Sequence, residues 1–462
     1  MIRSSTLLLA AFLAAPAFAQ NAPAGDIQRE SSKPAQTEST QKSALEALAG
    51  RLGLADDKTE ISYDDVMAKP DDVDLNYAFA RQQVRRGDLK GAAATLQRIL
   101  MVNPDLPKVR LFYAVILYRL DDLAESQVEL QRLSELKIDD AVRKELDVYQ
   151  NAIAKRQKKN HLSGQLGVGW EYDDNRNASP ASGKFLFANN PIIASQGRTS
   201  DTSALFLGSV QERHTFSGNN EAFVGFDYFR SEQTQMKTLN IQAYALSAGD
   251  VIRTPWDFTV RPTAIFDHVL LAQSTFLRDR GLSLRLERKI SQSTLLFTDF
   301  SDVYNDYVSV PSFQSAHGFT GVKADVSVGA ERVLSPRQKL TVSLGYGVKH
   351  ALLNIYQYDR WALDVSHMLL FRQGAFLVSS LSLHDDHYPH ADVFISSLYR
   401  HDTSGRLNFT LGAPLTAIHP KLKDVMATLT YEYYQSISNV TNYGYTNNKI
   451  SALLTYRWDA AF

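Results

Sequence analysis

From residue 161 onward, apolar and polar side chains alternate in one short run after another. Between Leu340 and Lys349, every second residue is apolar and the residues between them are small or polar. A period of two places the apolar side chains on one face of a β-strand and the polar side chains on the other. About fourteen such runs lie between residues 163 and 460, each about as long as a strand that crosses a bilayer. The pattern predicts a large antiparallel β-domain.

Charge on the polar faces separates two architectures for this domain. In a soluble β-sandwich the apolar faces of two sheets meet each other. In a transmembrane barrel the apolar face meets lipid, and the charged face lines a wet lumen. Many apolar positions near the strand ends are aromatic, as in the girdles of membrane barrels. We therefore predict a transmembrane antiparallel β-barrel of about 14 strands over residues 161–462, with a soluble sandwich or solenoid as the alternative.

The connections between the predicted strands differ in length. Short ones, such as 290–292 and 334–336, follow strands of even rank, whereas long ones, such as 173–201 and 305–317, follow strands of odd rank. Short turns belong to the periplasmic side of bacterial barrels. The first strand should therefore run outward, which places the region before it in the periplasm.

The last predicted strand ends the chain. Apolar residues occupy alternate positions from Ile450, and they include Tyr456, Trp458 and the terminal Phe462. Such a strand resembles the signal by which bacterial outer-membrane barrels are recognised for assembly. The resemblance implies the barrel-assembly machinery as a partner during biogenesis, and lipids of the outer membrane as the surroundings of the folded barrel.

Residues 42–160 differ from the β-domain and contain an internal sequence repeat that is typical of a helical fold. At an offset of 34 residues, Leu96-Gln97-Arg98 falls on Leu130-Gln131-Arg132, and 34 is the length of a tetratricopeptide repeat. We predict a tetratricopeptide-like helical domain, an ordinary helical bundle being the alternative, with additional helices at 43–54 and 140–157 closing the stack. The residues that carry the repeat signature are Ala80, Gly87, Ala92, Pro104 and Ala114.

The N-terminus predicts export. Arg3 precedes an apolar run from Leu7 to Leu13, and Ala17-Phe18-Ala19 is a small-residue cleavage pattern. Residues 1–19 are thus predicted to be a signal peptide, and residues 20–41, rich in Ser, Thr, Gln and Pro, a disordered tether. The predicted location is the outer membrane of a Gram-negative bacterium, with the helical domain in the periplasm.

Composition narrows the chemistry. The 462 residues carry a net charge of -1 and no cysteine, which argues against nucleic acid as a partner and excludes thiolate metal sites and cysteine nucleophiles. The sequence contains no nucleophile elbow, His-Glu-x-x-His motif or phosphate-binding glycine loop. We expect no enzymatic activity and no cofactor. An enzymatic barrel would need a Ser/His/acid cluster at one rim, which the sequence does not bring together.

Two polar runs remain as candidate sites. The first contains Asp173, Asp174, Asn175 and Asn177. Asp and Asn favour turns because they hydrogen-bond nearby backbone, but at a barrel mouth they could also contact a passing chain. The second run, from His384 to Asp392, has imidazoles and carboxylates that could bind a divalent ion, yet it falls in a predicted external loop where polar clusters are common. We expect no metal site there.

The combined architecture resembles the surface lipoprotein assembly modulator (Slam) family. The resemblance rests on a signal peptide, a small tetratricopeptide domain and a barrel that opens with Gly169-Trp170-Glu171-Tyr172-Asp173-Asp174-Asn175-Arg176-Asn177. It implies a translocator that moves a client, either a surface lipoprotein or a soluble secreted protein, across or onto the outer membrane, with the client bound by the helical domain. Outer-membrane polysaccharide exporters also join tetratricopeptides to a barrel, usually with a longer repeat array, and are the alternative. A simple diffusion porin would not need a protein-binding domain.

Overall fold

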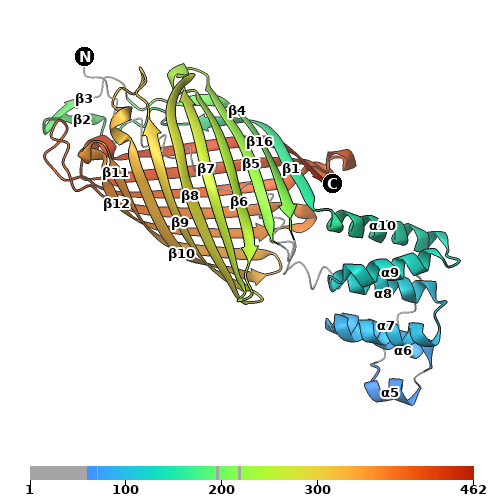
Figure 1. Cartoon of the computed structure of the whole chain (residues 1–462). Helices are drawn as coiled ribbons and strands as arrows, with labels where there is room; N and C mark the ends of the chain where they lie inside the picture. The colour runs from blue at the N-terminus through green and yellow to red at the C-terminus, as the bar shows by residue number, and fades with distance from the viewer. Residues whose placement is uncertain (1–59, 70, 194–196, 217–219) are drawn as a thin grey trace. The chain divides into compact units, whose positions relative to one another are not determined.

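The computed structural model describes residues 60–69, 71–193, 197–216 and 220–462 (Figure 1). The predicted signal peptide, the tether and the helix at 43–54 lie outside these residues. The described chain forms two compact units, a helical one up to Lys159 and a β one from Asn160 onward. Each unit is described by itself.

The helical unit consists of helices whose ends are set by capping residues. Asp72, Asp88 and Asp122 each accept a hydrogen bond from a backbone N–H in the first turn of the next helix. Gly87 ends a helix with φ of 86°, a left-handed conformation that glycine adopts without steric cost. Among the described residues, no helix combines the length and the apolarity needed to span a bilayer. The helices are α5 (Tyr63–Ala68), α6 (Val73–Arg86), α7 (Leu89–Val102), α8 (Pro107–Arg119), α9 (Leu123–Ser134) and α10 (Asp140–Gln157).

Two helix pairs, α6/α7 and α8/α9, share one apolar core. Ala80, Ala92 and Ala114 are fully buried where neighbouring helices approach, and Phe112 and Leu96 fill the space between them. In the second pair, a serine occupies the position that corresponds to Ala92 in the first. This buried Ser126 satisfies its hydroxyl by donating to the carbonyl of Ala114 at 2.7 Å. The less regular second repeat is therefore accommodated by one internal hydrogen bond.

The β unit is a closed barrel of antiparallel strands. Fourteen strands pair in the order β1-β16-β15-β14-β13-β12-β11-β10-β9-β8-β7-β6-β5-β4, and a separate hairpin pairs β2 with β3. The predicted fold class, a tetratricopeptide domain followed by a transmembrane antiparallel barrel of about 14 strands, is confirmed. The strands are β1 (Asn160–Asp173), β2 (Lys184–Phe187), β3 (Asn190–Ile193), β4 (Asp201–Thr215), β5 (Glu221–Gln233), β6 (Ile241–Arg253), β7 (Phe258–Leu271), β8 (Ser274–Ser291), β9 (Thr294–Tyr307), β10 (Gly321–Ser335), β11 (Gln338–Ala351), β12 (Tyr358–Leu370), β13 (Phe376–His387), β14 (His401–Pro414), β15 (Val425–Ser438) and β16 (Tyr445–Ala461).

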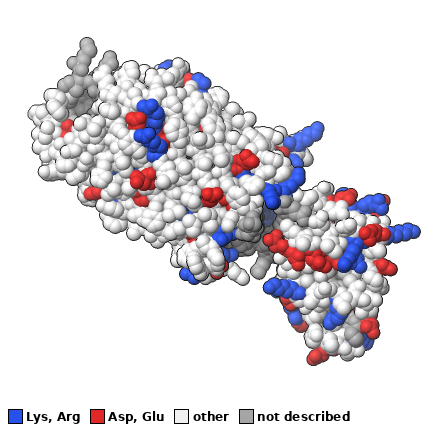
Figure 2. Space-filling model, viewed as in Figure 1, with Lys and Arg blue, Asp and Glu red and all other residues white. Residues whose placement is uncertain are grey.

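The outside of the barrel is apolar. Along β1 the exposed side chains are Leu166, Val168, Trp170 and Tyr172, which alternate with side chains that face inward. Large apolar side chains are exposed in the same way on the other strands, and most of the barrel face in Figure 2 carries no charged residue. Such a continuous apolar belt is unsuited to water and matches lipid.

Connections at the two ends of the barrel differ in length, with two exceptions to the predicted alternation. The start of β1 and the end of β16 meet at the rim that carries most of the short turns, since His161 pairs with Ala461. One exception lies at this rim, where residues 415–424 form a long connection between β14 and β15. The other lies at the opposite rim, where β7 and β8 join through Ala272 and Gln273 alone, both with positive φ. The alternation of apolar and polar residues breaks off between the strands predicted at 257–268 and 281–290, which predicted a longer connection there. Both strands nevertheless continue, because Leu271, Phe276 and Leu277 are buried in a cluster at this rim.

The seam between the first and last strands is fully paired. Pairing runs from His161 opposite Ala461 to Asp173 opposite Lys449. At Gly164 of β1, the indole of Trp458 fills the space that a side chain would need, 2.2 Å from an added Cβ. This glycine therefore makes room for a tryptophan of β16.

Candidate functional site

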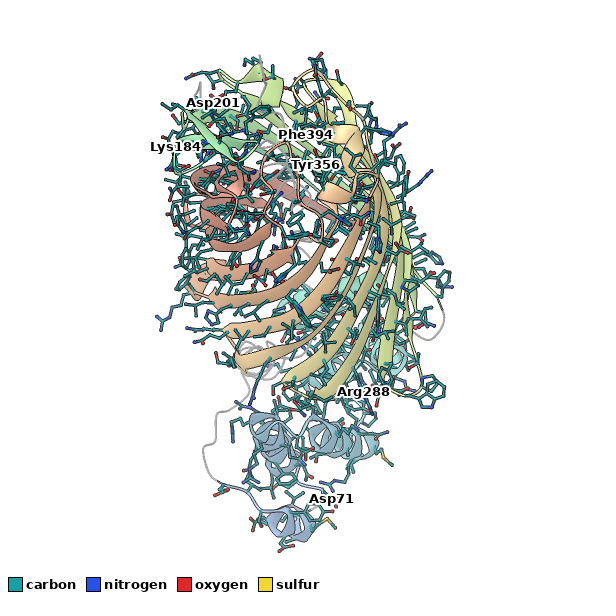
Figure 3. The ribbon with its side chains drawn as sticks, turned by 90° about the vertical axis from the view of Figure 1, so that its left-hand side faces the viewer. Asp71, Lys184, Asp201, Arg288, Tyr356 and Phe394 are labelled. Atoms are coloured by element: carbon teal, nitrogen blue, oxygen red, sulfur yellow. The ribbon has the colours of Figure 1, made fainter. Side chains whose placement is uncertain are left out.

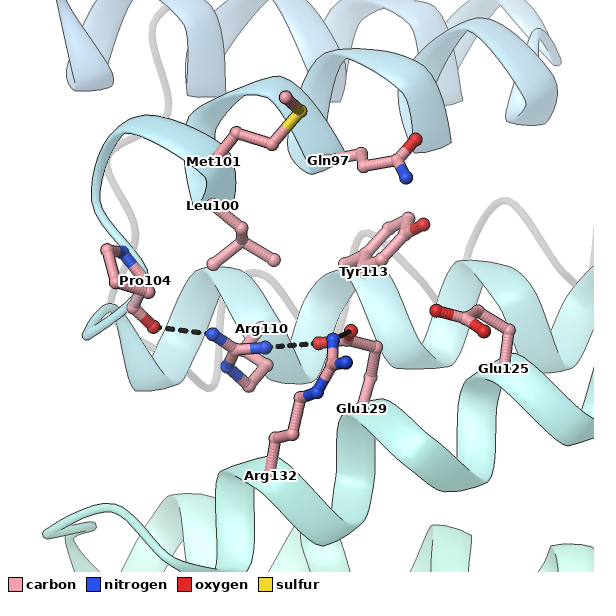
Figure 4. Close-up of a pocket in the computed structure, with 9 residues that line it drawn as sticks. All are labelled: Gln97, Leu100, Met101, Pro104, Arg110, Tyr113, Glu125, Glu129 and Arg132. Atoms are coloured by element: carbon pink, nitrogen blue, oxygen red, sulfur yellow. Dashed lines mark hydrogen bonds and ion pairs between the residues drawn. The ribbon is translucent and has the colours of Figure 1, made fainter.

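A groove of about 390 Å³ lies on the helical unit (Figure 4). Its floor is formed by α8, and α7 and α9 form its two sides. Tyr113 on the floor and Leu100 on the α7 side give the groove an apolar surface, and Met101, which is 80% exposed, stands at its edge. Burial raises the pKa of the Tyr113 hydroxyl, and the carboxylates of Glu125 and Glu129 act in the same direction. The complete lining is Gln97, Leu100, Met101, Pro104, Arg110, Tyr113, Glu125, Glu129 and Arg132.

An ionic network that joins α8 to α9 lines the rest of the groove. The buried guanidinium of Arg110 donates to the Glu129 carboxylate and, at 2.6 Å, to the carbonyl of Pro104. The second oxygen of Glu129 accepts from the more exposed Arg132 at 2.6 Å. Pro104, a signature residue of the repeat, thus contributes its carbonyl to the groove. An apolar floor beside fixed charges suits a partly apolar polypeptide segment with polar flanks.

The barrel lumen is lined by charged side chains that pair with one another. Arg360 of β12 makes a bidentate contact with Asp386 of β13, at 2.6 and 2.7 Å. Lys349 of β11 donates to Asn305 at 2.6 Å, and Asn305 donates to Asp279 at 2.7 Å. Positive and negative groups therefore alternate around this part of the wall.

The same mixing of charge continues on other strands. Arg285 contacts Asp299 at 3.0 Å and Glu287 at 2.6 Å, and Lys339 contacts Glu331 at 3.1 Å. These pairs join neighbouring residues on inward faces, so the charges of β8 to β13 that they include balance one another. The described residues of these strands form no stripe of a single charge.

The polar run after β1 anchors the first loop of the barrel. Asp173 and Asn175 are almost completely buried, and the Asn175 side chain bonds the backbone of Ser179 and the carbonyl of Thr446. Asp174 accepts from the backbone and side-chain nitrogens of Asn448 at 2.8 and 2.7 Å.

Two further bonds hold the same loop. Asp174 pairs with Arg198, and Asn177 accepts from the backbone of Thr199 at 3.0 Å. Burial acts to raise the pKa of the Asp174 carboxyl, but the hydrogen bonds from Arg198 and Asn448 outweigh it and lower the pKa. Turn anchoring thus accounts for the contacts of Asp173, Asp174, Asn175 and Asn177, and client contact by these residues stays a prediction.

The first loop reaches the loop after β13. Its β2–β3 hairpin bonds that segment through Ala188 and Asn189, whose backbone nitrogens donate to the carbonyls of Phe394 and Ile395. Leu186 and Asn442 exchange two hydrogen bonds, at 2.6 and 3.2 Å. Figure 3 shows Lys184 and Phe394 together at one end of the barrel. These contacts join three loops at one rim: the first loop, the loop after β13 and the loop between β15 and β16. We call this group the loop layer.

Arg400, which directly precedes β14, contacts two tyrosines of the loop layer. The guanidinium of Arg400 lies 4.2 Å from the ring centroid of Tyr388 and 3.4 Å from that of Tyr443, and it also bonds Asp402. Burial raises the pKa of Tyr443 to about 12, with the Arg400 charge acting against this. The loop layer could not be predicted from the sequence, because its contacts join residues that are far apart in the chain.

The histidine-rich run does not lie wholly in a loop, and this corrects the sequence prediction. His384 to His387 belong to β13, and only the part from Tyr388 to Asp392 is loop. Alternation along the strand divides the run, so that Asp386 faces the lumen whereas Asp385 and His387 face outward. His401, at the start of β14, lies directly opposite His387.

The C-terminal strand presents its aromatic residues on the outside. Tyr456 is half exposed and stacks on Trp458, with ring centroids 6.1 Å apart. Phe462 follows the end of β16 and is exposed. Recognition of this strand by an assembly machinery stays a prediction.

Comparison with known protein families identifies the repeat of the helical unit. Residues 83–144 match the tetratricopeptide repeat family. No curated protein matches the sequence. Among solved structures, the chain is similar to OccAB3 of Acinetobacter baumannii, with 8% identity, a TM-score of 0.35 and coverage of 65% of this chain and 99% of that one.

Two further structures from Pseudomonas aeruginosa are similar at the same level. The outer membrane protein OprD shares 8% identity, with a TM-score of 0.34 over 66% of this chain and 94% of that one. A FadL homologue shares 9% identity, with a TM-score of 0.35 over 65% and 90%. Likeness this distant brings no substrate to the present chain. The architecture itself is a closed transmembrane β-barrel that follows a tetratricopeptide domain in the chain.

Proposed function

We propose that this protein is an outer-membrane translocator that moves a client polypeptide across or onto the outer membrane. The observation that carries the proposal is the groove on the helical unit. Polypeptide binding is supported by a tetratricopeptide surface that combines an apolar part, at Leu100 and Tyr113, with an ionic part at Arg110 and Glu129. A barrel that only lets small solutes diffuse does not need such a surface.

The topology of the barrel supports the direction of transport. β1 begins at the rim with the short turns, which is the periplasmic rim of barrels of this type. A domain that directly precedes β1 would then receive its client in the periplasm. The client would arrive incompletely folded, dock an extended segment in the groove, and pass to the polar lumen. No nucleotide-binding motif is present in the sequence, so folding or capture outside the cell would supply direction.

Export of a polysaccharide is the second candidate function, and the charges that line the lumen are relevant to it. A charged glycan would be favoured by a stripe of one sign along its path, whereas the described lumen pairs Arg360 with Asp386 and Arg285 with Asp299. Opposite charges that are paired in this way cancel each other's field, so these pairs would not favour a charged glycan. The short repeat region also favours the translocator.

The test is surface exposure of a candidate client. The protein is expressed with a secreted or lipidated protein encoded beside it, and intact cells are shaved with protease. Exposure of the client should require the full chain and should be lost when residues 60–159 are deleted. If instead the client stays where it was while an extracellular polysaccharide disappears, the exporter replaces the translocator.

A point variant locates the client surface within the helical unit. Met101→Glu places a charge at the exposed edge of the groove and should reduce client exposure several-fold. Val148→Glu is the matched control, because Val148 is also an exposed apolar residue of a helix but lies on α10, outside the groove lining. Equal losses in the two variants would argue against the groove as the client site.

A further inference from the structure

Three side chains on the outer face of the barrel, at the rim with the loops, bring metal-binding atoms together. Asp385 and His387 come from the end of β13, and His401 comes from the start of β14. One nitrogen of each imidazole and one carboxylate oxygen all lie within 4.8 Å of one another. We propose that Asp385, His387 and His401 form a binding site for a divalent transition-metal ion such as Zn²⁺.

Strand geometry explains why these residues meet. Residues two apart on a strand share a face, which brings Asp385 beside His387, and the pairing register places His401 opposite His387. The two imidazole rings stack with centroids 4.1 Å apart and planes inclined by 23°. The barrel wall therefore fixes the backbones of all three ligands, in contrast to a site on a mobile loop.

The spacing of the donor atoms fits a small ion. Nε2 of His401 lies 2.8 Å from one oxygen of Asp385, and Nδ1 of His387 lies 3.6 Å from the other. Ligands at ordinary zinc distances in a tetrahedral site are about 3.3 Å apart. A small rotation of His401 about its side-chain bonds would open the first distance to this value. Both imidazoles are exposed, so an ion can enter from the water.

A fourth residue supports the carboxylate. The hydroxyl of Thr403 donates to Asp385 at 2.9 Å, and Thr403 is the register partner of Asp385 across the strands. Hydrogen bonds of this kind orient a metal-ligating carboxylate. Two imidazoles and one carboxylate select Zn²⁺, Cu²⁺, Ni²⁺ or Co²⁺ over Ca²⁺ and Mg²⁺, which prefer oxygen ligands alone.

Neighbouring aromatic residues place the cluster in the membrane interface. Trp361 is the register partner of Asp385 on the other side, is half exposed, and packs against Tyr346 with ring centroids 5.0 Å apart. Exposed Trp and Tyr mark the level of the lipid headgroups. The cluster stands at this level, where water and ions reach it. Three protein ligands leave at least one coordination position open to water or to an anionic group of the surroundings.

The first experiment uses the full chain in detergent, purified without a histidine tag. Co²⁺ is the probe because its visible absorption reports the ligands, and Zn²⁺ is then titrated in competition. We expect one equivalent of Co²⁺ to bind with a spectrum of nitrogen and oxygen ligands, and Zn²⁺ to displace it. Binding should weaken as the pH falls, because protons compete for the imidazole nitrogens. Absence of a saturable Co²⁺ spectrum in the wild-type protein overturns the proposal without any variant.

Variants then assign the ligands. His387→Ala or His401→Ala should abolish saturable binding, and Thr403→Val should weaken it by about tenfold. The matched control is His390→Ala, since His390 is an exposed histidine of the adjacent loop outside the cluster. The electrophoretic mobility of unheated samples checks that each barrel is closed, and His387→Gln replaces any alanine variant that fails this check. Unchanged binding in the His387 and His401 variants, or its loss in His390→Ala, contradicts the proposed ligands.

Discussion

The helical unit places its large apolar side chains inside, whereas the barrel places them on its outer surface. In the helical unit, Phe112 and Leu96 are buried in one interior core, and most charged residues face water, the buried Arg110–Glu129 pair excepted. In the barrel, Val168 and Leu282 are exposed on the outside, and ion pairs such as Arg360–Asp386 are inside. The solvent of each unit accounts for this inversion, because water favours a buried apolar core and lipid favours an apolar surface. The same substitution should therefore have different effects in the two units.

The largest expected effect concerns the core of the helical unit. Phe112→Ala removes a fully buried ring and should destabilise this unit by about 3–5 kcal/mol, because the neighbouring helices cannot close the cavity. Thermal loss of helical circular dichroism in the full chain measures the change. The barrel should keep its unheated electrophoretic mobility. Simultaneous loss of both signals would show that the units do not fold independently.

The next effect uses matched valines to contrast the two solvents. Val328 lies exposed near the middle of β10, and Val128 lies exposed on α9. Val328→Arg places a charge in lipid and should destabilise the barrel by about 2–4 kcal/mol. Val128→Arg should change stability by less than about 0.5 kcal/mol. Barrel stability is read from urea titration in lipid vesicles, and similar losses in the two variants would contradict the lipid-facing assignment of Val328.

A smaller effect is expected in the loop layer. Asn442→Ala removes both hydrogen bonds to Leu186, each contributing about 1 kcal/mol. The β2–β3 hairpin should then leave its partners more often, and hydrogen exchange of residues 184–193 should rise. Asn354→Ala, in the loop between β11 and β12, is the comparison variant. Identical exchange in wild type and Asn442→Ala would show that these two hydrogen bonds do not hold the hairpin in the loop layer.

The smallest effect is the pH dependence of the first loop. The pKa of Asp174 is lowered in the folded state, so its contribution is present above the ordinary carboxyl value of 3.8 and is lost as the pH falls through the lower, folded value. Hydrogen exchange of residues 174–193 should rise below about pH 4 in the wild type. Asp174→Asn should raise exchange at neutral pH and remove this step. Asp257→Asn, in a short turn at the other rim, should leave the profile unchanged.

Much of the fold could be predicted because strict local patterns encode it. A period of two fixed the outward and inward faces of the strands, and the 34-residue period located the helix pairs. The pattern failed between β7 and β8, where Phe276 and Leu277 are apolar neighbours that pack into a rim cluster instead of alternating. At that point tertiary packing replaces local alternation.

The candidate sites were less predictable because they depend on contacts between distant residues. The run from His384 suggested metal ligands, but only strand register selects Asp385 and His387 from it and adds His401. The groove draws on Met101 and Glu129, which are ordinary helix residues in the sequence. The Asp174 run was recognisable as a turn, although its partner Asn448 lies on the last strand.

Pairing between β1 and β16 also sets an order for folding. Every other neighbouring pair in the barrel is a hairpin or a short excursion, whereas this one joins strands at opposite ends of the barrel sequence. Closing such a long-range contact is slow, and it cannot begin before the C-terminal strand is available. The described helices contact one another over short separations in the chain, and they precede the barrel. They should therefore be folded while the barrel is still open, which gives assembly a stage at which a complete helical unit is attached to an open sheet.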